Sequence, residues 1–167
     1  STFNWFHYSI DYRIGTRYLN EHIVDNFKQE AMKNSFLRDL LLSDSIYISS
    51  NLNFNNLSPL STYLGKPGRE DLGGIDFELY KKRQKQHREA EILSSLDTYK
   101  FIEKSTNIYG YQNFVCDTSG SICEIVNPED TNDPVLNHLS SNTLIILIKG
   151  SDKHKAELIE RFTSNPK

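Results

Sequence analysis

The sequence predicts an α+β fold with residues 1–167 in a single domain: a mostly antiparallel sheet, N-terminal helices on one face and a C-terminal helix. Three observations support this prediction. A helical pattern covers residues 16–42, short apolar runs bounded by turn residues are typical of strands, and a second amphipathic segment covers residues 151–162. The chain is long enough to bury one hydrophobic core, so we expect that neither a metal nor a disulfide is needed for stability.

The N-terminal part is predicted to be one strand followed by helix. Residues 3–10 alternate bulky and polar side chains, which indicates a first strand, and residues 11–15 are expected to turn the chain. From residue 16 to residue 42 apolar side chains recur every three or four positions, as on an amphipathic helix with Thr16 as its N-cap. The pattern slips near residues 33–35, so one long helix and two consecutive helices both fit.

Further apolar runs are predicted to be strands of the sheet. They cover residues 46–48, 99–103, 108–116, 122–126 and 144–148. The run at 144–148 carries no charge and is expected to lie at the centre of the sheet. Residues 51–76 are rich in Asn, Ser, Pro and Gly and are expected to form a long functional or mobile loop. Residues 78–96 fit either a solvated helix or a polar helix that runs into a strand at Glu91.

Composition and charge exclude some classes of partner. The net charge of -3 and the pI near 5.9 argue against a general nucleic-acid coat protein and against a protein that binds anionic membranes. No apolar run approaches the roughly 18 residues that span a bilayer, and no signal peptide is visible. We therefore expect a cytoplasmic protein without a membrane anchor.

The two cysteines, Cys116 and Cys123, flank a turn-rich segment at residues 117–121. A hairpin centred on Ser119 and Gly120 would place them opposite one another, so a disulfide is geometrically conceivable. In an intracellular protein we expect two reduced thiols instead. A zinc site would need further ligands, which no nearby histidine supplies at a recognisable spacing.

Short catalytic motifs are few. The sequence has no phosphate-binding glycine loop, no His-Glu-x-x-His and no Gly-x-Ser-x-Gly. Asp76 and Glu78 ahead of Lys81 resemble a metal-dependent nuclease, although the usual carboxylate-x-Lys spacing is absent. Arg83 and His87 resemble the Arg and His of a helical ribonuclease site with one residue fewer between them. A nuclease therefore remains open as an alternative.

One constellation resembles the arginine-specific branch of the ADP-ribosyltransferases. Its members, in chain order, are Arg13, the pair Ser61 and Thr62, and the Glu-x-Glu of Glu89 and Glu91. The resemblance implies that Arg13 holds the phosphates of NAD and that the Ser-Thr pair supports its nicotinamide end. It also implies that Glu91 holds a ribose hydroxyl and stabilises the oxocarbenium ion, while Glu89 handles the acceptor. A forked cation suits a pyrophosphate, and a carboxylate suits a developing positive charge.

The other branch of the same family offers a variant of this site. His7 and Tyr8 resemble its His and Tyr, and Tyr47 would then provide a stacking face for nicotinamide. In either form NAD is the expected cosubstrate, and the acceptor, a protein or a nucleic acid, stays open.

A second resemblance concerns residues 49–56, which follow the predicted strand at 46–48. They are similar to the Ser-Ser-Pro-x-x-Phe-Asn-Asp signature of an uncharacterised prokaryotic family that includes abortive-infection proteins. Asn51 replaces the proline, Asn56 replaces the aspartate, and the usual Trp-x-x-Tyr-Ala segment is absent. This resemblance implies a toxin or phage-defence effector.

A non-catalytic interaction protein of the immunity or antitoxin type is the main alternative, with another protein, such as a toxin, as its partner. Geometry separates the two hypotheses. The transferase needs Arg13, Ser61 and Glu91 around one cleft, whereas an interaction protein needs none of them close together.

Overall fold

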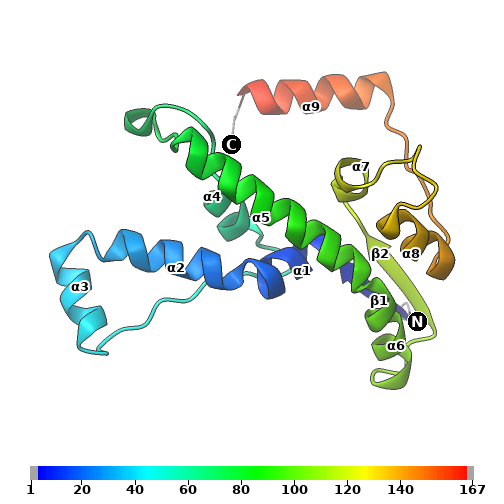
Figure 1. The fold of residues 1–167 in the computed structure, drawn as a ribbon, viewed down its shortest axis with the longest axis horizontal. Helices are drawn as coiled ribbons and strands as arrows, with labels where there is room; N and C mark the ends of the chain where they lie inside the picture. The colour runs from blue at the N-terminus through cyan, green and yellow to red at the C-terminus, as the bar shows by residue number, and fades with distance from the viewer. Residues whose placement is uncertain (1–3, 165–167) are drawn as a thin grey trace.

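The computed structural model describes residues 4–164, except for the side chain of Phe162, and is mostly helical (Figure 1). The predicted fold class is wrong. In the described residues β1 (Trp5–Ser9) and β2 (Asn113–Asp117) form a two-stranded parallel sheet, with Phe6 opposite Phe114, instead of a mostly antiparallel one. The strand predicted at residues 3–10 is confirmed for Trp5–Ser9, with residue 3 outside the described residues, and the strand predicted at residues 108–116 is confirmed from Asn113 onward.

The predicted helical range is interrupted after Ala31, so α2 and α3 are separate helices, as one of the two alternatives predicted, and two short helical elements precede them. The elements are α1 (Ile10–Arg13), the π-helical η1 (Ile14–Tyr18), α2 (Asn20–Ala31) and α3 (Ser35–Leu42). The predicted turn at residues 11–15 is wrong, because the Ser9 hydroxyl accepts a hydrogen bond from the Tyr12 backbone N–H (3.3 Å) and caps a helix there. The Thr16 hydroxyl donates to the Tyr12 carbonyl (2.7 Å), so Thr16 is not an N-cap.

Helix α5 (Phe77–Leu96) runs through the middle of the molecule (Figure 1). Its first turn is capped by Asp76, whose Oδ1 accepts from the backbone N–H groups of Glu78 (2.9 Å) and Leu79 (3.1 Å). Before it come α4 (Ser58–Leu64) and the 3₁₀ turn η2 (Glu70–Leu72), so the predicted long loop contains helix.

The other predicted strands are wrong, because short apolar runs do not distinguish a strand from a buried helix turn. Residues 99–103 belong to α6 (Thr98–Asn107), and residues 122–126 fall mostly in α7 (Ser121–Ile125). Residues 46–48 pair with no strand, and Tyr47 is 87% exposed. The hairpin expected between the cysteines is absent from this described segment, and both thiols are free. Burial raises the pKa of the Cys116 thiol to about 11.

Two apolar clusters pack against α5. The larger one joins the sheet and the N-terminal helices to α4, and its buried members are Tyr8, Ile10, Ile14, Leu19, Ile23, Leu60, Tyr63 and Ala90. The smaller one holds α7 and α8 (Pro134–Asn142), and its buried members are Ile125, Val135 and Leu139. Because α5 contributes to both clusters, it connects the two halves of the molecule.

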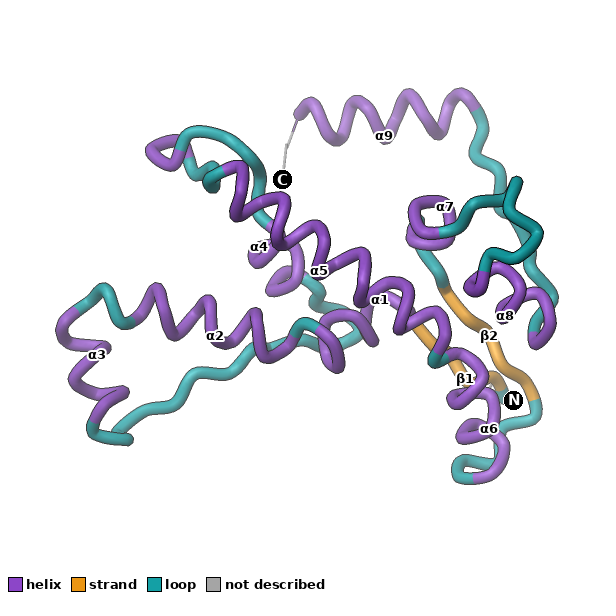
Figure 2. Tube along the Cα trace, viewed as in Figure 1, coloured by secondary structure: helices purple, strands orange, loops and turns teal. Residues whose placement is uncertain are grey.

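The C-terminal segment lies apart from these clusters (Figures 1 and 2). The predicted closing helix is confirmed as α9 (Asp152–Ser164), and its described side chains are all exposed. The predicted central strand at residues 144–148 is wrong, because these residues have no regular secondary structure and make no backbone hydrogen bond within the described chain. Among the described helices none is long and apolar enough to cross a membrane.

Candidate functional site

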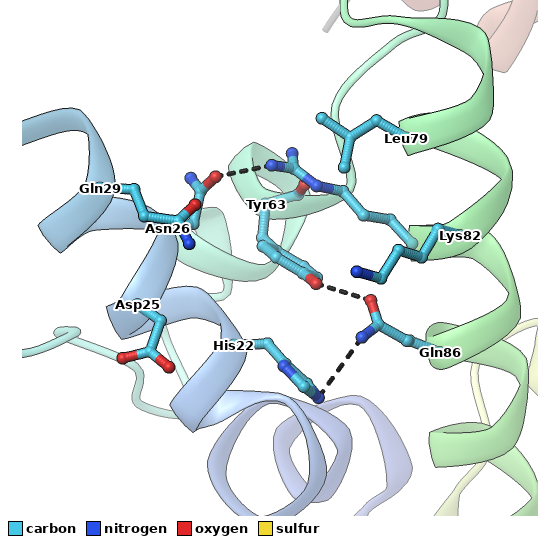
Figure 3. A pocket seen from close by; sticks show the side chains of 9 residues that line it. His22, Asp25, Asn26, Gln29, Tyr63, Leu79, Lys82 and Gln86 are labelled. Atoms are coloured by element: carbon cyan, nitrogen blue, oxygen red, sulfur yellow. Dashed lines mark hydrogen bonds between the residues drawn. The ribbon is translucent and has the colours of Figure 1, made fainter.

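A polar cleft lies where α2, α4 and α5 meet (Figure 3). It measures about 190 Å³ and is lined by His22, Asp25, Asn26, Gln29, Tyr63, Leu79, Lys82, Arg83 and Gln86. Pockets that hold drug-sized ligands measure roughly 300 to 1,000 Å³. This cleft is therefore suited to a smaller group of atoms.

Helix periodicity brings these side chains together. His22 and Asn26 are four residues apart on α2, and Lys82 and Gln86 are four residues apart on α5, so each pair lies on one helix face. Helix α4 adds Tyr63 between them, as Figure 3 shows. The site is thus made by three segments that are distant in sequence.

Arg83 is the most unusual residue of the cleft because it is charged and only 8% exposed. One guanidinium N–H donates to the Tyr63 carbonyl and another to Asn26 Oδ1 (2.6 Å), and the guanidinium lies 4.6 Å from the centre of the Tyr63 ring. No described carboxylate lies within 4.0 Å of it. A buried cation without a counter-charge is unfavourable, so the cleft favours an anion.

Tyr63 is held in place by its hydroxyl. The hydroxyl donates to Gln86 Oε1 (2.7 Å), and Gln86 Nε2 lies 3.5 Å from His22 Nε2 (Figure 3). The rings of Tyr63 and His22 are nearly parallel, with centroids 6.4 Å apart. Burial raises the pKa of Tyr63, although Arg83 opposes the shift, so the phenol is a neutral donor near pH 7.

The charge balance of the cleft is positive. Lys82 is exposed on α5 and makes no ion pair within the described residues. Asp25 is the one carboxylate in the lining, and its Oδ1 lies 3.4 Å from Lys28 Nζ. The lining therefore contains two cations, Lys82 and Arg83, and one carboxylate, Asp25, which already pairs with Lys28.

Arg13 lies elsewhere, in a buried network around Asp97. Its Nε and Nη2 donate to Asp97 Oδ2 at 3.0 and 2.7 Å. The Tyr18 hydroxyl donates to the same oxygen (2.6 Å), and Lys100 donates to Oδ1 (2.8 Å). Burial of Asp97 opposes its ionisation, but the hydrogen bonds from Lys100, Tyr18 and Arg13 outweigh burial and hold its pKa at about 2.

Glu91 is buried in a third place, against α7. Its Oε1 accepts from the Ser121 hydroxyl (2.8 Å), and its Oε2 lies 3.4 Å from His87 Nδ1. Burial opposes its ionisation, but the contacts with His87 and Ser121 lower its pKa overall. Glu89 is exposed and lines a shallow depression of about 110 Å³ that shares His22 with the polar cleft.

The remaining predicted site residues are also dispersed. Ser61 and Thr62 are exposed on α4, beside the Tyr63 that faces the cleft. His7 Nε2 lies 4.0 Å from Asp117 Oδ2. The buried Tyr8 donates its hydroxyl to the Ser94 carbonyl (2.7 Å), and burial raises its pKa.

The structure thus does not gather the predicted transferase residues around either of these two clefts. Neither is lined by Arg13, Ser61 or Glu91. Transferase activity stays a prediction that needs a test with NAD.

The predicted nuclease residues are in local contacts. Asp76 caps α5, and Lys81 Nζ lies 2.7 Å from Glu78 Oε1. The described residues contain no group of three or more metal-ligating side chains. Of the two residues that resemble a helical ribonuclease site, Arg83 lines the cleft and His87 lies against Glu91. The two side chains therefore do not share one site.

Comparisons with known proteins give no relative. No family model matches the chain, no curated protein matches it, and no solved structure matches it.

Proposed function

We propose that this protein binds a small phosphate-bearing ligand in the polar cleft of α2, α4 and α5. The observation that carries the proposal is Arg83, which is 8% exposed and has no carboxylate within 4.0 Å among the described residues. A ligand anion would neutralise this charge inside the cleft.

The donors around Arg83 fit a phosphate better than an uncharged ligand. A guanidinium presents five N–H donors in a fixed fork, and two of those of Arg83 are used by Tyr63 and Asn26. Lys82 supplies a second cation, and Gln29 has an amide in the same lining. Two cations suit the double charge of a phosphate monoester.

The size of the cleft favours a compact ligand. A volume of about 190 Å³ suits a phosphate with a few attached atoms rather than a whole dinucleotide. The ADP-ribosyltransferase prediction is separate, because it assigns the NAD phosphates to Arg13, which donates to Asp97 here.

Substituting Lys82 by alanine is expected to weaken binding of inorganic phosphate and of AMP about tenfold. A charge-assisted hydrogen bond contributes about 1.5 kcal/mol or more, and 1.4 kcal/mol corresponds to tenfold in affinity. Isothermal titration calorimetry of the wild type and the variant measures this. Lys81→Ala is the matched control, because Lys81 is the neighbouring lysine, pairs with Glu78 and does not line the cleft. Equal affinities in the two variants would contradict the proposal.

The variant Arg83→Met tests the same cleft through its buried cation. Methionine keeps most of the aliphatic volume, so the fold is expected to persist while saturable phosphate binding disappears. Circular dichroism checks that the variant is folded. If the folded variant still binds phosphate, or if the wild type binds neither phosphate nor AMP, the cleft is not an anion site.

NAD belongs in the same titration as a third ligand. Binding of NAD that survives Arg83→Met would place the dinucleotide outside the cleft and favour the transferase prediction.

A further inference from the structure

The segment from residue 144 to residue 148 is the largest continuous apolar exposure described in the chain. Its exposed fractions are 85% for Leu144, 44% for Ile145, 75% for Ile146, 81% for Leu147 and 91% for Ile148. No backbone hydrogen bond within the described residues involves residues 144–150. Five consecutive apolar residues with free backbone groups have the composition of a buried strand, and no sheet pairs with them in the described chain.

The same chain contains a small sheet with two open edges. Strands β1 and β2 are paired only with each other, so each has an outer edge of unpaired backbone groups. Parallel sheets are normally buried on both faces, yet Trp5 and Val115 are 50% and 43% exposed on one face of this sheet. An added apolar strand would pair with an open edge and widen the sheet.

A loop packs beside β1, so β2 is assigned as the receiving edge. The loop at Phe54 lies against the β1 side, where its ring is 5.2 Å from His7 and 4.4 Å from Tyr12. We infer that residues 144–148 of one copy of this protein add as a strand to the β2 edge of a second copy, in a reciprocal, strand-exchanged dimer.

The connection after α8 explains why the receiving sheet belongs to another copy. Helix α8 ends at Asn142, and Thr143 is extended (φ -142°, ψ 157°), with its N–H and its hydroxyl both bonded to the Leu139 carbonyl at 2.8 and 2.7 Å. The strand-forming segment thus begins after one connecting residue, whereas helix-to-strand loops in α/β units usually have 2 to 6 residues. A connection this short does not reverse the chain onto its own sheet, and short hinges favour domain swapping.

The arm that follows also projects outward. Helix α9 lies away from the body of the molecule, and all its described side chains are exposed (Figure 2). An arm that leaves its own domain in this way is what a swapped dimer requires, and both complementary parts occur in every copy.

The area involved suits a specific dimer. Burying a leucine or isoleucine side chain removes on the order of 100 Å² from water, so the exposed apolar surface of one arm amounts to about 400 Å². Two arms contribute about 800 Å², and a matching area on the two edges that they cover would bring the total to about 1,500 Å². Stable protein interfaces remove about 1,200 to 2,000 Å².

Sedimentation velocity of the intact chain at rising concentration tests this inference. We expect a monomer–dimer equilibrium, with the dimer dominant at micromolar concentrations. Ile146→Pro should weaken dimerisation at least tenfold, because proline removes an N–H from the middle of the added strand. Lys149→Pro, which lies just past the apolar run, is the matched control and should keep the dimer.

Lengthening the hinge provides an independent test. Two glycines inserted between Thr143 and Leu144 should let the segment turn back onto its own sheet, giving a monomer in which hydrogen exchange still protects the amides of residues 144–148. A wild type that is monomeric at all concentrations, a dimer that survives Ile146→Pro, or an insertion variant that dimerises as strongly as the wild type would each overturn the strand exchange.

Discussion

Replacing Asp97 by asparagine is expected to lower the free energy of unfolding by about 3 kcal/mol. The Asp97 carboxylate is 2% exposed and accepts hydrogen bonds from Arg13, Tyr18 and Lys100. The asparagine amide has the same shape but no negative charge. Its NH2 group would also meet either the donors of Arg13 and Tyr18 or that of Lys100, and a donor cannot accept their hydrogen bonds. Arg13 and Tyr18 would then lose part of their acceptor while still partly buried, which costs more than losing a surface ion pair.

Urea unfolding followed by circular dichroism measures this effect. Asp39→Asn is the matched control, because Asp39 is exposed on α3 and its ion pair with Arg38 is long, at 3.9 Å. The control is expected to change stability by about 0.5 kcal/mol or less. If the two variants unfold at the same urea concentration, the Asp97 network does not stabilise the fold.

The same network predicts how stability depends on pH. The pKa of Asp97 is about 2 in the folded protein, below its ordinary value of 3.8. A lowered folded-state pKa means that the carboxylate stabilises the fold above about pH 4 and that this contribution is lost as the pH falls toward 2. The contribution amounts to about 2 kcal/mol. Between about pH 5 and pH 2 the wild type should therefore lose more stability than Asp97→Asn.

The contrast between correct and incorrect strand predictions has a physical cause. The segment around Trp5–Ser9 alternates in polarity, which is characteristic of a strand covered on one side, and it is a strand. The segment at residues 99–103 mixes apolar and charged residues, and the helical α6 places Phe101 against the core while Lys100 reaches back to Asp97. Over five residues such a pattern fits either structure, and tertiary packing decides between them.

The candidate site was only partly predictable for a related reason. Arg83 and His87 stood out by residue type, but the cleft around Arg83 also needs His22 and Asn26 from α2 and Tyr63 from α4. Polar residues four apart on a helix indicate a shared face but not what that face meets. The packing of α2 and α4 on α5 supplies that information, and no short motif in the sequence encodes it.

Arg13 illustrates the same limit for single residues. Its residue type suits a phosphate as well as a carboxylate, and the structure supplies a carboxylate 84 positions away in the chain, at Asp97. A site that binds NAD through Arg13 would have to replace Asp97 as the acceptor, so NAD binding and the stability of this network would be coupled.

Removing the Glu91 side chain is the second substitution with a large expected effect. Glu91→Ala should lower the free energy of unfolding by about 2 kcal/mol, because it leaves the buried Ser121 hydroxyl without its acceptor and opens a space beside α7. Glu89→Ala is the matched control, two residues away on the same helix and exposed. Its effect should be about 0.5 kcal/mol or less. Equal effects in the two variants would contradict a structural role for Glu91.

Glu91→Gln separates this structural role from the predicted transferase role. Glutamine keeps a side-chain oxygen that can accept from Ser121, so the variant should be more stable than Glu91→Ala. If Glu91 stabilises a sugar cation, the loss of its charge should slow NAD cleavage on the order of a hundredfold or more, while Glu89→Gln should lose mainly transfer to the acceptor. NAD hydrolysis measured beside the melting curve of each protein distinguishes the outcomes. If the wild type cleaves no NAD while Glu91→Ala is still destabilised, the role of Glu91 is structural. The carboxylate then stabilises the packing of α7 on α5 through Ser121.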